Sequence, residues 1–207
     1  KFNTDNTLMF YAQPSFLKTV SVFRDPNAWY HIVWSVDSTQ AIESNRSKIY
    51  INGEQITDFS TETYPALNWE SAFNSSGYTE EIGRYSYNNG SLFDGYLSEV
   101  NFVEGQALTS SDFGEIDGAY GHWKPKAYSG AYGSTGYYLD FSDNGTKHIV
   151  TANGNTNHST DQSKIGATGI YFDGTGDSLT ASSSDFGFGT GDFTVEYWNY
   201  NSSLHNY

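Results

Sequence analysis

The sequence predicts an all-β protein built as an antiparallel sandwich, and three observations support this. Aromatic residues make up 17% of the 207 residues, whereas charged residues make up only 16%. Short stretches of alternating apolar and polar residues recur along the chain, with Gly, Asn and Asp between them. Aromatic and β-branched side chains favour strands, and Asn, Asp and Gly favour tight turns. Good helix formers are too sparse for long amphipathic helices.

The clearest strand signal is Trp29–Val36, in which Ile32, Trp34 and Val36 share one face. A hairpin is predicted where two apolar stretches flank the pair Asn52 and Gly53. Other patterns predict strands at residues 8–10, 19–23, 47–51, 54–57, 81–85, 96–103, 136–141, 148–151, 169–174, 178–180 and 193–198, and a helical turn at 110–113.

Charge and composition exclude several classes of function. A net charge of −14 argues against a nucleic-acid partner, which would need clustered Lys and Arg. The absence of Cys excludes disulfides and thiol chemistry, and favours a bacterial or viral product. No apolar run reaches the roughly 18 residues of a membrane span. The chain opens on Lys1 with no signal peptide, so we expect a segment of a longer polypeptide.

Several blocks together resemble a known family. They are WYHIVWSVD at 29–37, KIYING at 48–53, FDGYLSEV at 93–100, YFDGTGDSL at 171–179 and FGTGDFTVEYW at 188–198. In combination they resemble the laminin-G-like, concanavalin A-like modules of bacteriophage tail and fibre proteins, the marine type especially. The resemblance implies a jelly-roll sandwich, carbohydrate binding and, in many such modules, calcium near one rim.

The order of these blocks is unusual, because the closing blocks of the module come first and its opening blocks come last. One arrangement is a tandem cut at both ends, with the back of one sandwich at 1–107, a Tyr-, Gly- and Ser-rich linker at 108–136, and the front of a second at 137–207. In the other arrangement, residues 137–207 fold back as in a circular permutant and supply strands to the first part. Unpaired edge strands must be covered in either case.

The carboxylates of the sequence suggest two kinds of chemistry, glycoside hydrolysis and calcium binding. The string GEID at 114–117 resembles the core of laminarinase-like hydrolases, but Tyr120 stands where that family carries its acid and Gly118 interrupts the strand. The sequence therefore predicts no enzyme. Asp–Gly pairs recur on loops, where turn formation is the simpler interpretation. Calcium is the alternative, with Asp173 and Asp177 as the candidate ligands.

Aromatic residues in loop-like sequence are the candidate ligand-binding residues. Sugar rings stack on exposed aromatic faces, and the candidates are Tyr85, Tyr87, Trp123, Tyr128 and Tyr132. The alternative is that these rings pack on the sandwich or on a neighbouring subunit. The five histidines show no metal-binding spacing, and His31 is predicted to be structural.

The resemblance leads to three hypotheses about function. The first is a virion surface module of a tail or fibre, extracellular and homo-oligomeric, that contacts a host-surface glycan receptor and neighbouring subunits. The second is a purely structural virion protein. The third is a secreted bacterial adhesin or polysaccharide-binding module. Fold alone does not separate them.

Overall fold

A computed structural model describes residues 1–71, 80–85, 92–141, 150–181 and 191–202. Its main layer is a large antiparallel sheet in the order β13-β14-β8-β16-β3-β4-β5, with β11 also paired to β8. The strands of this main sheet are β3 (Trp29–Val36), β4 (Ser47–Ile51), β5 (Glu54–Ile56), β8 (Asp94–Glu104), β11 (Tyr137–Leu139), β13 (Asn157–Ser159), β14 (Gly169–Asp173) and β16 (Phe193–Asn201).

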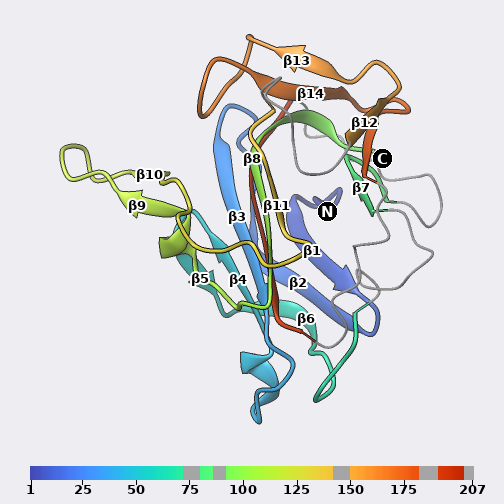
Figure 1. Cartoon of the computed structure of the whole chain (residues 1–207), viewed down its shortest axis with the longest axis vertical. Helices are drawn as coiled ribbons and strands as arrows, with labels where there is room; N and C mark the ends of the chain where they lie inside the picture. Colours follow the sequence, from blue (N-terminus) through green and yellow to red (C-terminus); the bar gives the residue numbers. More distant parts are fainter. Residues whose placement is uncertain (72–79, 86–91, 142–149, 182–190, 203–207) are drawn as a thin grey trace.

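Two smaller sheets cover one face of the main sheet, and a hairpin lies on its other side (Figure 1). The first small sheet contains β1 (Thr7–Ala12), β2 (Ser15–Val22) and β6 (Phe59–Thr63). The second contains β7 (Glu80–Ile82), β12 (Val150–Asn153) and β15 (Ser178–Ala181). The hairpin consists of β9 (Gly114–Ile116) and β10 (Trp123–Pro125), and two 3-10 turns are η1 (Glu43–Asn45) and η3 (Ser110–Asp112). The chain is thus the all-β antiparallel sandwich that the sequence predicts.

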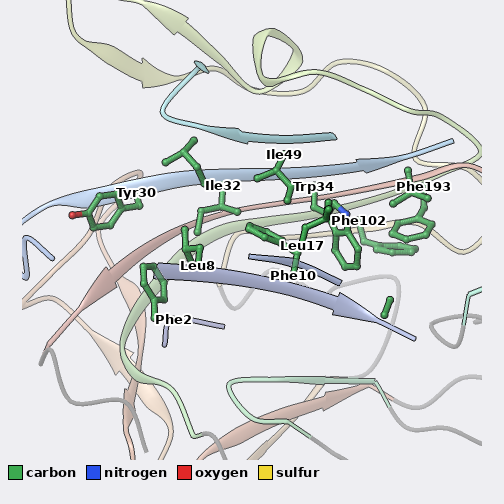
Figure 2. Packing of buried hydrophobic residues seen from close by; sticks show 13 residues of the cluster. Phe2, Leu8, Phe10, Leu17, Tyr30, Ile32, Trp34, Ile49, Phe102 and Phe193 are labelled. Carbon is green, nitrogen blue, oxygen red and sulfur yellow. The ribbon is translucent and has the colours of Figure 1, made fainter. Parts of the chain in front are cut away.

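The hydrophobic core fills the space between the main sheet and the β1-β2-β6 sheet (Figure 2). Leu8 and Leu17 are fully buried and face Ile32 and Ile49 across the layers. Phe193 of β16 packs edge-on against Trp34 of β3, with ring centres 5.8 Å apart. The predicted face of Ile32, Trp34 and Val36 is confirmed, because all three belong to this core.

A second buried cluster lies beneath the β12-β15-β7 sheet. It joins β8, β14 and β15 through the side chains of Leu97, Val100, Ile170, Phe172 and Leu179. Each of these side chains is at most 5% exposed. The two small sheets therefore cover different lengths of one continuous main sheet.

Strand β16 occupies the position between β3 and β8. It is paired along most of its length with β3 on one side and with β8 on the other, both antiparallel. Strands from residues 137–207 thus lie in the same sheet as strands from residues 1–107, which is the geometry of the second arrangement considered above. The tandem arrangement concerns a longer polypeptide and stays a prediction.

The stretch at 108–136 differs from the extended linker expected from its sequence. It contains η3, as predicted, and then β9 and β10, which the fading periodicity did not indicate. The predicted strands at 8–10 and 19–23 are parts of the longer β1 and β2. Strands β6 and β13 were not predicted, because both are largely exposed and polar. Residues 148–149 and 188–190 of two predicted blocks lie outside the described residues.

Replacing Phe193 with Ala is expected to destabilise the chain as a single unit. The side chain is 1% exposed and fills the core between Trp34 and Phe102, so its loss leaves a cavity. Large aromatic truncations of this kind cost about 3–5 kcal/mol. Urea unfolding followed by circular dichroism and tryptophan fluorescence is expected to show one transition, shifted to lower urea.

Val20→Ala on β2 is the matched control, because that side chain is 49% exposed and its loss creates no cavity. Two separate transitions, of which Phe193→Ala shifts only one, would contradict a single cooperative sheet.

Candidate functional site

The outer face of the main sheet is covered along part of its length by residues from 108–136. Phe113 is 2% exposed and packs on Val33, Tyr50 and Val103 of the sheet. The ring of Tyr128 lies on Phe113, with centres 5.1 Å apart. This cover leaves the other part of the outer face open, beside the β9–β10 hairpin.

An open groove of about 600 Å³ lies beside this hairpin, and it extends to Phe23, Ile51 and Ile56 at the margin of the hydrophobic core. We call it the tryptophan groove, because Trp29, Trp123 and Trp198 line it. The other side chains that define it are the apolar Phe23, Ile51, Ile56 and Ile116 and the polar Ser21, Asn52, Glu54, His122 and Lys164. They come from the β2–β3 region, the β4–β5 hairpin, the β9–β10 hairpin, the β13–β14 loop and β16.

The Asn52–Gly53 turn positions one wall of the groove. Asn52 and Gly53 have positive φ angles of 50° and 92°, as the predicted two-residue hairpin turn requires. The side-chain oxygen of Asn52 accepts a hydrogen bond from the backbone N–H of His31, and the Asn52 N–H donates to the His31 carbonyl. The β4–β5 hairpin is therefore fixed to the start of β3.

Trp123 forms a second wall, and two glycines make room for it. A Cβ atom on Gly53 would lie 2.6 Å from the indole, and one on Gly114 would lie 2.3 Å from it. Real side chains do not approach so closely, so only Gly allows the ring to lie flat at both positions. The hairpin that carries Trp123 is closed by Lys124, whose ammonium lies 3.2 Å from Glu115 and 3.5 Å from Asp117.

A buried polar network holds Trp123 from beneath. Its indole N–H donates to Nδ1 of His31 over 2.8 Å, and Nε2 of His31 lies 2.8 Å from Oε1 of Glu196. The other Glu196 oxygen accepts from the Asn101 amide at 2.6 Å, and Asn101 in turn accepts from the Tyr132 hydroxyl at 2.6 Å. His31 also stacks on Trp198, with ring centres 4.6 Å apart.

Burial favours the uncharged forms of His31 and Glu196. Removal from water, with a smaller contribution from the nearby charge of Lys164, lowers the pKa of His31 to about 3. Removal from water also raises the pKa of Glu196 well above its usual 4.5, which outweighs the opposing hydrogen bond from Asn101. Because Nδ1 of His31 accepts from Trp123, the neutral imidazole carries its proton on Nε2, toward Glu196.

The predicted aromatic candidates lie in different places. Trp123 lines the groove, whereas Tyr128 and Tyr132 are half-buried and pack edge-on against each other at 5.1 Å. Tyr85 is 41% exposed and does not line the groove. Tyr87 lies outside the described residues. Of the four candidates that the structure describes, it brings Trp123 to the groove.

The two predicted calcium ligands both form turn hydrogen bonds. Asp177 is fully buried, and its two oxygens accept from the backbone N–H groups of Asn155 and Asp173 at 2.8 and 2.9 Å. Asp173 accepts from the Thr175 N–H and from the Asn155 side chain. Within the described ranges, no group of three His, Asp or Glu side chains is placed to hold a metal ion. Calcium at this position stays a prediction.

The hydrolase-like string lies on the β9–β10 hairpin. Glu115 is exposed and paired with Lys124, while Asp117 accepts hydrogen bonds from the backbone N–H groups of Ala119 and Tyr120. These bonds, followed by Lys124, hold the pKa of Asp117 below its usual value. Both carboxylates therefore make contacts within the hairpin, and neither lines the groove.

The sequence did not indicate four residues that build the site. Trp29 and Trp198 were assigned to strands without a role, and neither Lys164 nor Glu196 was singled out. In the sequence, Glu196 is the polar member of an alternating strand and looks like a residue that faces solvent. Its partners in the polar network lie next to it only because β16 pairs with β3 and β8. No local signal could have revealed it.

Replacing Gly114 with Ala is expected to displace the Trp123 indole, since the new methyl group would overlap it. Overpacking of this kind costs about 1–3 kcal/mol. The resonance of the Trp123 indole N–H is expected to shift as its bond to His31 lengthens. Gly118→Ala in the same hairpin is the control, because nothing lies within 4 Å of its Cβ position. Equal indole spectra for the two variants would contradict the packing described.

The His31–Glu196 pair predicts a pH dependence that Glu196→Gln alters. As the pH falls below 6.5 the unfolded chain binds a proton on His31, whereas the folded chain, in which the pKa of His31 is lowered and that of Glu196 is raised, binds one on Glu196 instead, so the two uptakes offset each other. Without the Glu196 proton, only the unfolded chain gains a proton as the pH falls. The free energy of unfolding of the variant should therefore fall, relative to the wild type, by up to about 1.4 kcal/mol per pH unit from 6.5 to 4.5.

Urea unfolding at pH 4.5, 5.5 and 6.5 measures this difference. Glu115→Gln, which removes an exposed carboxylate from the hairpin, is the control. Parallel curves for the wild type and Glu196→Gln would show that the folded pair is not neutral.

Comparison with known proteins gives one match. The laminin G-type family model described as the concanavalin A-like lectin/glucanases superfamily matches residues 1–112. Neither the curated proteins nor the solved structures give a match. In the described part of the chain, no helix is long and apolar enough to cross a membrane. With more than half of its length matched and an antiparallel sandwich as its fold, the chain belongs to the concanavalin A-like lectin/glucanases superfamily.

Proposed function

We propose that this chain is a non-enzymatic glycan-binding module of a virion surface, a tail or fibre component that contacts a host-surface glycan. The observation that carries the proposal is the tryptophan groove, where Trp29 and Trp123 line an open space beside polar side chains. Indole rings present a wide apolar face to the C–H groups of a sugar, while polar neighbours bind its hydroxyls. Membership in a lectin and glucanase superfamily is compatible with such a ligand.

The arrangement of carboxylates favours binding over hydrolysis. Retaining hydrolysis requires two carboxyl groups about 5 Å apart on either side of the scissile bond. The groove is lined by one carboxylate, that of Glu54, while Glu196 beneath it is 1% exposed and is covered by the network. A bound sugar would therefore meet aromatic rings and a single carboxylate.

Contacts with other subunits form the second half of the proposal. Tyr11, Val20 and Val22 on the β1-β2-β6 sheet are 38%, 49% and 47% exposed. Phe16 and Tyr11 pack against each other at 6.0 Å on the same small sheet. Exposed apolar groups gathered on one sheet are typical of protein interfaces. The tryptophan groove adjoins this surface at β2, because Ser21 lines the groove between Val20 and Val22.

The proposal is tested by a glycan array probed with the whole chain, followed by titration of the best-bound glycan. Trp29→Ala and Trp123→Ala are each expected to weaken binding about tenfold or more, because truncation of a central aromatic residue removes most of its contact area. Trp29 lies outside the His31 network, so its variant separates loss of binding from loss of that network.

Tyr11→Ala removes an exposed ring from the opposite layer and is expected to leave glycan binding unchanged. Failure of the folded wild type to bind any glycan would reject the proposal in favour of a purely structural role. Binding that survives both tryptophan substitutions would place the site elsewhere.

A further inference from the structure

Lys164 is the lysine that lines the tryptophan groove. It lies in the loop between β13 and β14, and its ammonium is 4.7 Å from the centre of the Trp198 ring. Three other cations are paired with carboxylates: Lys18 with Asp5 at 2.8 Å, Lys124 with Glu115 at 3.2 Å, and Arg84 with Glu81. Among the residues that the structure places, no carboxylate lies within 4 Å of Lys164.

Lys164 is notable for its place, because it faces a groove in a chain that has 24 acidic residues and 10 basic ones. The ammonium is partly removed from water, and this burial lowers the pKa of Lys164. The ring of Trp198 stabilises its charge from one side. An anionic group in the groove would supply the missing partner.

The surroundings of Lys164 also favour an anion. Asn52 uses its side-chain oxygen for His31, which leaves its amide N–H groups as donors at the groove. His122 is exposed on the opposite wall. The one opposing charge is Glu54, which is exposed on the β4–β5 hairpin. Repulsion by the net charge of −14 is screened beyond about 8 Å at physiological salt, so these near groups decide the preference.

We infer that Lys164 is the residue that determines specificity, and that the ligand of the groove is a saccharide bearing a carboxylate or sulfate group. The anionic group binds Lys164, and the adjoining sugar ring stacks on the indoles of Trp29 and Trp123. This inference rests on the proposed glycan-binding function. Carboxylate and sulfate share the chemistry that an ammonium recognises, and they are separated by the choice of probe.

Three probes of similar length test it by titration with the whole chain: an oligogalacturonate, a sulfated galactan oligomer and the matching neutral galactan oligomer. At least one acidic oligomer is expected to bind about tenfold more tightly than the neutral one, because charge-assisted hydrogen bonds are the strong ones. Which acidic probe binds identifies the anionic group. Raising the salt concentration should weaken the binding of that oligomer.

The variants separate charge from packing. Lys164→Met keeps an unbranched apolar chain over Trp198 and is expected to abolish the preference for the acidic oligomer. Lys164→Arg should keep the preference. Lys48→Met removes the same charge from β4, outside the groove, and should change nothing. Circular dichroism and thermal melting establish that each variant is folded.

The outcomes distinguish this inference from the function on which it rests. Equal or tighter binding of the neutral oligomer overturns the role of Lys164 but leaves glycan binding intact. A preference for acidic oligomers that persists in Lys164→Met overturns it as well. If none of the three probes binds and the glycan array is also blank, the proposed function fails together with the inference.

Discussion

The pairing of β16 with both β3 and β8 is the constraint on which the rest of the structure depends. Without β16 those two strands would face each other across an empty position, and the main sheet would divide into two parts. The partners lie far apart in sequence, since Phe193 is opposite Val36 on one side and Glu104 on the other. Such long-range pairing costs loop-closure entropy before the contacts compensate for it.

The same strand links the core to the groove. Phe193 faces inward and completes the hydrophobic core, whereas Glu196 and Trp198 lie among the groups of the outer face. Alternation along a strand thus puts stability and the site on opposite sides of one element. The register of β16 decides both, because a shift of one residue would exchange the two faces.

The sequence predicted most of the sandwich because its strands carry strong local signals. The alternation in Trp29–Val36 and the Asn52–Gly53 turn need no knowledge of distant residues, and both were found as predicted. Strands β9 and β10 were missed because each has three residues and few apolar neighbours in sequence. The groove was largely missed for a different reason. Lys164 lies at the groove because its loop contacts Trp198 in the folded chain, and a local sequence pattern cannot predict a contact between such distant residues.

The walls of the groove have a consequence for variation in sequence. Trp29 is the first residue of β3, Asn52 occupies a hairpin turn, Trp123 belongs to a separate hairpin and Lys164 to a loop. The walls that carry Asn52, Trp123 and Lys164 are each attached to the sheet through a short segment of their own, so one of these walls can be replaced while the paired strands beneath it stay the same. A module built in this way can acquire a new binding preference through one loop at a time, with the sandwich unchanged as its support.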